Sequence, residues 1–258
     1  MLALAVLVAL QGNAVFLDHT PDGSVAARLA QRSVPLFSGQ GIMPIPVDHP
    51  AGQQNIEFLS SSGTVLGSRT IEVRKVAFPQ QNIVIDPSKK QIEPSPGERE
   101  AVSRLRETLT PVRRFALPFT PPVRGCMNSP FGVARLHNGQ PSGNYHRGVD
   151  QRSPHGRPVR AAAAGVVRIS RMFNLHGGTI GLDHGQGVTS LYLHLSRFAV
   201  KEGHTVKQGD IVGYIGATGF ATGPHLHWQV HVHGVPVNPL QWVKLTPCAT
   251  CRECRLGG

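Results

Sequence analysis

The sequence predicts a mainly β protein whose C-terminal half is a curled, antiparallel sheet. Apolar and polar residues alternate over 188–194 and 225–233, which is the period of a β-strand. Glycine and proline, at 29 and 21 of 258 residues, interrupt the chain too often for long helices. A hydrophobic content of 40% with only 16% charged residues excludes a wholly disordered chain and a coiled coil. The length favours two domains.

Residues 1–14 fit two interpretations. The first ten are apolar, which is too short a stretch to cross a bilayer, because a spanning helix needs about 20 residues. They suit the apolar region of a secretory signal peptide that ends at the small-residue stretch 12–14, although basic side chains are missing from its start. The alternative is a buried first strand.

The remaining chain divides by composition. Short alternating runs over 15–85 predict a small β-rich domain, and 86–122 is a proline-rich linker. The linker contains one short helix, with Ser95 as its expected N-cap and an apolar stripe ending at Leu109. Residues 123–243 then form the domain with the curled sheet, and 244–258 form a cysteine-containing tail.

Three histidine-containing segments carry the chemistry: His146-Arg-Gly-Val-Asp150, Tyr192-Leu-His194 and His225-Leu-His227. Residues at even separation on an extended strand share a face, so His146 can project beside Asp150, and His225 beside His227. Two neutral imidazoles and a carboxylate suit Zn²⁺ with a fourth position open to water. Each spacing alone is a weak signal, and their joint occurrence is what predicts a site.

The order of these segments resembles the lysostaphin-type (LytM-domain) zinc metallopeptidases, which are peptidoglycan endopeptidases of bacterial cell walls. The resemblance covers roughly 123–243, and 15–110 looks more loosely like the N-terminal β domain and connecting helix of Gram-negative members. It implies a fold of the duplicated-hybrid-motif type. The segments that carry it are Ser129-Pro-Phe-Gly132, His146-Arg-Gly-Val-Asp150, Gly156-Arg-Pro-Val159, His184-Gly-Gln-Gly187, Tyr192-Leu-His-Leu-Ser196, Gly203-His-Thr-Val-Lys-Gln-Gly209 and Gly219-Phe-Ala-Thr-Gly-Pro-His-Leu-His227.

The resemblance assigns a role to each candidate residue. His146, Asp150 and His227 match the family's zinc ligands, with one Zn²⁺ per chain, and His194 and His225 match its two catalytic histidines. The implied function is hydrolysis of peptide cross-links in peptidoglycan by metal-activated water. The alternative is a non-catalytic cell-wall-binding module that activates a peptidoglycan amidase. Family members that only activate other hydrolases typically lack some of the ligand and catalytic residues, whereas none of these residues is missing here.

The charge of the chain is consistent with an anionic partner. The net charge is +11, of which residues 121–258 carry +9, from 14 basic and 5 acidic side chains. Aromatic residues make up only 6%, so the stacking platforms of a nucleic-acid-binding surface are not expected. Peptidoglycan stem peptides and the anionic cell envelope fit better, and a solvated basic face without a partner is the alternative. The resemblance, together with the signal-like start, implies a periplasmic or secreted protein.

The other histidines are expected to lie outside the site. His184 stands before a glycine and is interpreted as a structural residue in a turn. His231 and His233 share the strand parity of His227, and we expect them to face solvent; the alternative is that one of them lies beside the site. His176 is expected in a loop.

Cysteine is sparse, with Cys126 near the start of the C-terminal domain and Cys248, Cys251 and Cys254 in the tail. An oxidising compartment would allow an intramolecular disulfide between Cys126 and a tail cysteine. A second metal site and free thiols are the alternatives.

Overall fold

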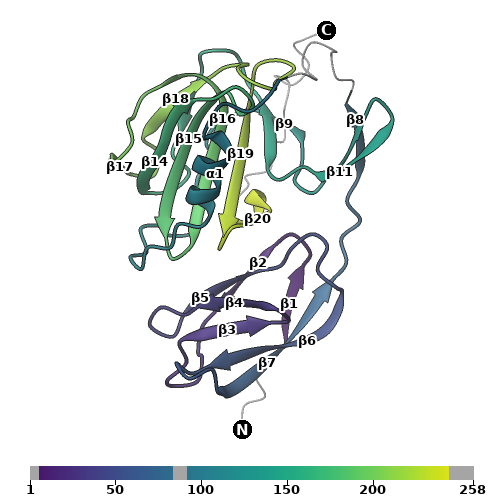
Figure 1. Ribbon diagram of the computed structural model, residues 1–258, viewed down its shortest axis with the longest axis vertical. Helices are drawn as coiled ribbons and strands as arrows, with labels where there is room; N and C mark the ends of the chain where they lie inside the picture. Colours follow the sequence, from purple (N-terminus) through teal and green to yellow (C-terminus); the bar gives the residue numbers. More distant parts are fainter. Residues whose placement is uncertain (1–5, 84–91, 244–258) are drawn as a thin grey trace. The chain divides into compact units, whose positions relative to one another are not determined.

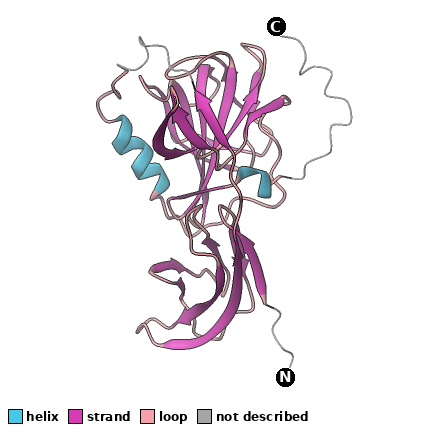
Figure 2. Cartoon of the chain, turned by 90° about the vertical axis from the view of Figure 1, so that its right-hand side faces the viewer, coloured by secondary structure: helices cyan, strands magenta, loops and turns pink. Residues whose placement is uncertain are grey.

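The computed structural model describes residues 6–83 and 92–243. Nearly all regular structure in these residues is β, as predicted (Figure 2). The chain separates into two compact units, one made of residues 1–77 with 235–237 and the other of 78–234 with 238–258. The domain boundaries expected above remain predictions, and the cysteine tail lies outside the described residues. No helix in 6–83 or 92–243 has the length and apolar character needed to cross a membrane.

The first unit consists of two sheets around one apolar core. Its larger sheet has the order β1-β7-β6-β3-β4, in which β1 is parallel to β7 and the other pairs are antiparallel. Side chains such as Ile56, Phe58 and Ile71 alternate inward along these strands and are almost fully buried. The strands are β1 (Leu7–Leu10), β2 (Ala14–Leu17), β3 (Ala26–Leu29), β4 (Arg32–Pro35), β5 (Gly41–Pro44), β6 (Gly52–Leu59) and β7 (Val65–Arg74), to which the short β20 (Val235–Val237) is added.

The apolar start of the chain takes the alternative form in this structure. Residues Leu7–Leu10 pair with β7, and Ala9 packs into the core of the first unit. Cleavage after Ala14 would remove this edge strand. The signal peptide stays a prediction.

The second unit is built on the curled antiparallel sheet that the sequence predicts, with the central order β17-β14-β15-β16-β19-β12-β9 (Figure 1). A separate three-stranded sheet has the order β11-β10-β8. The elements are β8 (Gln80–Ile83), β9 (Cys126–Ser129), β10 (Ala134–His137), β11 (Gln140–Tyr145), β12 (Val149–Arg152), β13 (Pro158–Arg160), β14 (Gly165–Met172), β15 (Gly178–Gly185), β16 (Val188–Phe198), β17 (Thr205–Val206), β18 (Ile211–Ile215), β19 (His225–Val232) and a 3-10 turn, η2 (Pro239–Gln241).

The linker helix is present as α1 (Glu98–Arg106), shorter than its apolar stripe suggested. Its N-cap is Gly97 and not the expected Ser95, whose hydroxyl accepts a hydrogen bond from the backbone N–H of Asn174 instead. Val102 and Leu105 pack with Leu191 and Leu193 of β16. The helix therefore covers part of one face of the central sheet, in front of β15 and β16 in Figure 1.

Candidate metal centre

Two candidate ligands come from neighbouring strands of the central sheet. Asp150 of β12 lies directly opposite His227 of β19, and His227 lies opposite Leu193 of β16. Cross-strand partners share a face, so both candidate ligands project from the face on which α1 packs. The predicted parity of His225 and His227 is confirmed, because both lie on β19.

His146 reaches the same place by a different route from the one expected. It lies in the connection between β11 and β12, so the even spacing to Asp150 is not that of one continuous strand. The bend at Gly148 carries the chain past β19 so closely that a Cβ there would lie 2.3 Å from the carbonyl oxygen of Trp228. Glycine at this position therefore permits the turn that brings His146 back toward Asp150.

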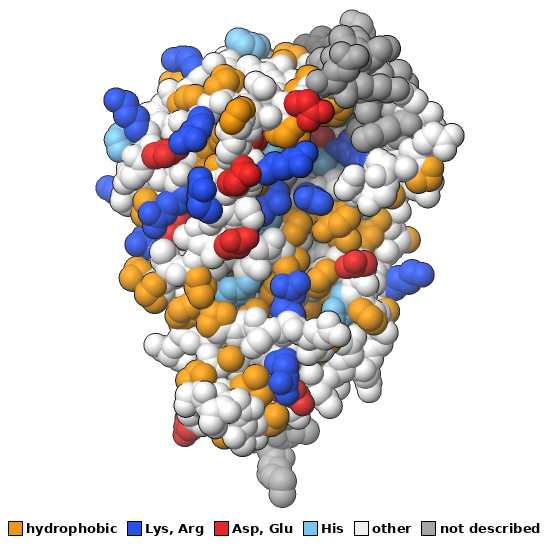
Figure 3. Space-filling view, viewed as in Figure 1, with side chains coloured by type: hydrophobic (Ala, Val, Ile, Leu, Met, Phe, Trp, Pro, Cys, Tyr) orange, Lys and Arg blue, Asp and Glu red, His pale blue; other side chains and the backbone are white. Residues whose placement is uncertain are grey.

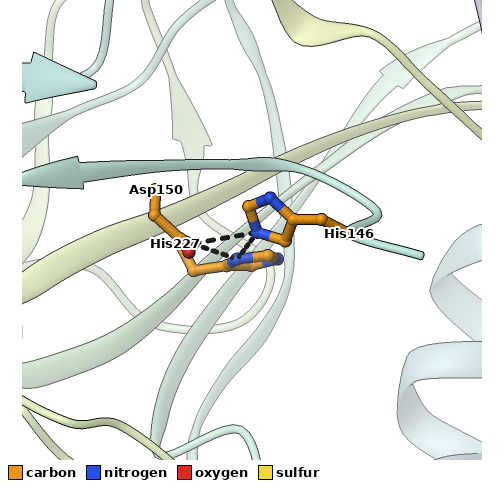
Figure 4. A group of neighbouring side chains, drawn as sticks. All are labelled: His146, Asp150 and His227. Carbon is orange, nitrogen blue, oxygen red and sulfur yellow. Dashed lines mark hydrogen bonds and ion pairs between the residues drawn. The ribbon is translucent and has the colours of Figure 1, made fainter. Parts of the chain in front are cut away.

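The three side chains converge on one point (Figure 4). His146 Nε2 lies 3.0 Å from Asp150 Oδ1 and 3.0 Å from His227 Nδ1, and 2.6 Å separates His227 Nδ1 from Asp150 Oδ1. All three residues are buried. A tetrahedral zinc ion would hold such ligand atoms roughly 3.3 Å apart, so an expansion of a few tenths of an ångström would accommodate one.

Polar contacts on the far side of each ring bear on which of its nitrogens can bind a metal. His146 Nδ1 donates to the backbone carbonyl of Pro130 over 2.8 Å, so in the neutral ring Nε2 carries a lone pair that faces Asp150 Oδ1. A lone pair against a carboxylate oxygen is repulsive, and a cation between them removes the repulsion. The amide nitrogen of Gln229 lies 2.7 Å from His227 Nε2, while the amide oxygen of Gln229 is buried without a partner. Binding of a metal through Nδ1 requires the proton on Nε2, so the amide would turn its oxygen toward Nε2 to accept that proton.

Arg135 completes the surroundings of the carboxylate. Its guanidinium donates to Asp150 Oδ2 over 3.3 Å, while Oδ1 faces the two imidazoles. Burial alone would raise the pKa of Asp150, but its interactions with His227 and His146 lower that pKa well below its usual range. The group is therefore an anion. Sequence reasoning missed Arg135, because no motif marks it.

The two expected catalytic histidines lie beside this centre. The ring centroids of His194 and His225 are 4.9 Å apart, and His194 is 6.1 Å from the ring of His227. His194 Nδ1 donates to the carbonyl of Thr218 over 2.9 Å and His225 Nδ1 to the carbonyl of Gly223 over 2.8 Å. Each neutral ring therefore keeps its Nε2 unprotonated. Burial, with the charges of His225 and His227, lowers the pKa of His194 to about 3.

The orientation of His194 depends on an unusual backbone conformation. Leu191 and Leu193 lie on the site face of β16, so strict alternation would send His194 to the opposite face with Tyr192. Its φ of 64° lies in the left-handed region, and the pairing of β16 is irregular around it. Such a distortion re-aims a side chain at a cost of about 1 kcal/mol or more.

All five predicted residues line one cleft of about 620 Å³ within the second unit. The cleft wall also includes Gln81 and Asn82 of β8, Arg106 of α1 and His176.

The prediction for His231 was wrong, and the prediction for His184 was right in its role but not in its position. His231 is completely buried, whereas we expected it to face solvent. His184 is structural as expected, but it lies inside β15 and not in a turn, with Nδ1 donating to the carbonyl of Ala164 and Nε2 bonded to Ser190.

The disulfide stays a prediction. Cys126 is in β9, and the three tail cysteines lie outside the described residues.

Comparison with known proteins gives one consistent result. The family model described as Peptidase family M23 matches residues 144–239. The DD-carboxypeptidase/endopeptidase Mpg of Neisseria meningitidis is 40% identical over 121 residues, which are 47% of this chain and 28% of that protein. The peptidoglycan DD-endopeptidase ShyC of Vibrio cholerae is 41% identical over 113 residues, which are 44% of this chain and 26% of that protein. The matched segment thus spans little more than a quarter of either relative.

A solved structure extends the likeness to both units. The crystal structure of a Pseudomonas aeruginosa protein assigned to peptidase M23 superposes with a TM-score of 0.66 at 26% identity. The match covers 91% of this chain and 94% of that chain.

Proposed function

We propose that the chain is a zinc-dependent endopeptidase that hydrolyses peptide cross-links of peptidoglycan, which the match of residues 144–239 to the model of Peptidase family M23 supports. The observation that carries the proposal is the convergence of His146 Nε2, His227 Nδ1 and Asp150 Oδ1 on one point of an open cleft. The two curated relatives are named for DD-peptide hydrolysis, which supports a D-amino acid peptide as substrate. The proposed location is the cell envelope.

In this proposal His146, Asp150 and His227 hold one Zn²⁺, which supplies Lewis acidity toward water and the scissile carbonyl. Asp150 contributes the negative charge that offsets part of the ion's charge, and Arg135 holds its second oxygen. The carbonyl of Pro130 keeps His146 in the tautomer that ligation through Nε2 requires, and the amide oxygen of Gln229, turned toward Nε2 of His227, would do the same for ligation through Nδ1.

His194 and His225 carry the proton chemistry. Each has an unprotonated Nε2 beside the ligands, because its Nδ1–H is engaged by a backbone carbonyl. Such a nitrogen accepts a proton from the attacking water and returns it to the leaving amine. Among the described residues that line the cleft, Asp150 is the one carboxylate. No second carboxylate there could therefore act as the base.

The test uses the full chain and purified sacculi. Protein treated with a chelator should release no muropeptides, and added Zn²⁺ should restore release, with mass spectrometry identifying the bond that is cut. If the zinc-loaded protein instead stimulates a purified amidase while cutting nothing itself, the amidase-activator alternative replaces this proposal.

A further inference from the structure

The cleft contains two arginines that the proposed chemistry does not use. Arg106 is the last residue of α1, and Arg147 directly follows His146. Both line the cleft, together with Tyr145 and Gln229. We call Arg106 and Arg147 the arginine pair. Figure 3 shows that Lys and Arg side chains gather on the face where Figure 1 draws α1, with fewer acidic ones among them.

The arginine pair has no acidic partner among the described residues. Burial, and next the charge of Arg147, lower the pKa of Arg106 to about 10, and only the Tyr145 phenol acts in the other direction. The Nε of Arg106 is buried without a hydrogen-bond acceptor. Two neighbouring guanidinium groups repel each other. Arg106 is partly buried and Arg147 is exposed, and no ion pair joins either of them to a carboxylate of the described residues.

His231, whose ring feels the charge of both arginines, does not supply negative charge either. His231 lies four positions beyond His227 on the same face of β19 and is completely buried, and neither ring nitrogen has a hydrogen-bond partner. Burial, and then the charges of Arg106 and Arg147, hold the pKa of His231 well below its usual value. The imidazole is therefore neutral, and the region is electropositive with unsatisfied donors.

We propose that the arginine pair is a carboxylate-binding subsite, which receives the free α-carboxylate of the residue that follows the scissile bond. This inference rests on the proposed function and narrows its substrate. A D-alanyl-diaminopimelate cross-link, or a terminal D-alanyl-D-alanine, has a free carboxylate on the residue whose amine is released. A glycine bridge has none there. Planar guanidinium groups match the geometry of a carboxylate, so the pair selects the first class of peptide.

The experiment measures binding separately from hydrolysis. Two synthetic peptides, an acylated D-alanyl-D-alanine with a free carboxylate and the same peptide as its carboxamide, are titrated into the zinc-loaded full chain carrying His194→Ala. We expect the free carboxylate to bind roughly tenfold more tightly than the carboxamide, as charge-assisted hydrogen bonds would give. Arg106→Gln and Arg147→Gln should each weaken carboxylate binding severalfold and change carboxamide binding little.

Arg104→Gln is the matched control, because it removes the same charge from the same helix at an exposed position outside the cleft. It should keep the full preference for the carboxylate. Equal binding of the two peptides by the parent protein, or no measurable binding of either, would overturn the subsite. Sacculus hydrolysis by the chain with His194 intact reports on the proposed function independently of this result.

Discussion

The buried carboxylate of Glu98, at the start of α1, accepts a hydrogen bond from Nδ1 of His176. It also accepts from the backbone N–H groups of His176 and Leu175, over 2.8 and 3.3 Å. The carbonyl of His176 in turn accepts from the backbone N–H of His194 over 3.1 Å. The linker helix is thus connected through one loop to the strand residue with the left-handed backbone.

Replacing Glu98 with glutamine should disturb His194 without removing a metal ligand. The neutral amide accepts these hydrogen bonds more weakly, and its NH₂ group opposes donors in a buried site, which costs roughly 1–3 kcal/mol. We expect the melting temperature to fall and kcat to fall roughly tenfold, while zinc affinity stays unchanged. Glu100→Gln, at an exposed position of the same helix, is the control. Unchanged kcat and stability would show that Glu98 does not position His194.

His227→Ala should abolish zinc binding. The variant removes one of three converging ligands, and the remaining pair cannot hold the ion tightly, so a competition assay with a chelating dye should show at least a roughly hundredfold loss of affinity. His204→Ala, an exposed histidine outside the cleft, controls for the loss of an imidazole. Stoichiometric zinc in His227→Ala would mean that the metal lies elsewhere.

His194→Ala should separate metal binding from turnover. His194 is not one of the three proposed zinc ligands, so the zinc content of the variant should match that of the parent protein. Loss of a general base or acid typically lowers the rate by about 10²- to 10⁴-fold, and muropeptide release should fall accordingly. Hydrolysis of sacculi at the parent rate would disprove its role.

Gly148→Ala should destabilise the second unit. The added methyl group would lie 2.3 Å from the Trp228 carbonyl and 3.0 Å from His227 Nε2, so backbone must shift, at a cost of roughly 1–3 kcal/mol. Denaturant unfolding should show this loss, together with weaker zinc binding. Gly223→Ala is the stability control, because a Cβ there meets nothing within 4 Å. If both variants unfold at the same denaturant concentration, the close approach at Gly148 is not a constraint.

Stability of the metal-free protein should fall as the pH drops from about 6.5 to 4. Burial lowers the pKa of His184 to about 4, against about 6.5 in the unfolded chain, so the unfolded state binds more protons in this interval. The stabilisation is fully present above pH 6.5, and the difference amounts to about 3 kcal/mol by pH 4.

Chemical denaturation at several pH values, with a chelator present, measures this loss. His184→Gln should be less stable at pH 7 and should show a smaller decrease on acidification, because it lacks the titrating group. A parallel decrease in both proteins would assign the pH dependence to other residues.

The amino-acid sequence alone predicts the central strands and the candidate metal ligands of this protein. The alternation over 188–194 and 225–233 predicts strands because burial of one face requires that period, and both strands are central in the sheet. The candidate ligands were identifiable because only a few side-chain types bind a borderline cation. The residue types that bind such a cation can be recognised in the sequence even where the residues lie far apart in the chain.

Only the tertiary structure determines how these residues meet. The orientation of His194 needs a positive φ and a contact with His176, and local alternation predicts the opposite face. His231 is buried against expectation. The contact of Arg135 with Asp150 and the electrostatic interaction of Arg106 with Arg147 each join two segments that carry no common motif. The reason is physical: periodicity records which side of a strand is apolar, whereas these contacts depend on which strands and helix share a face.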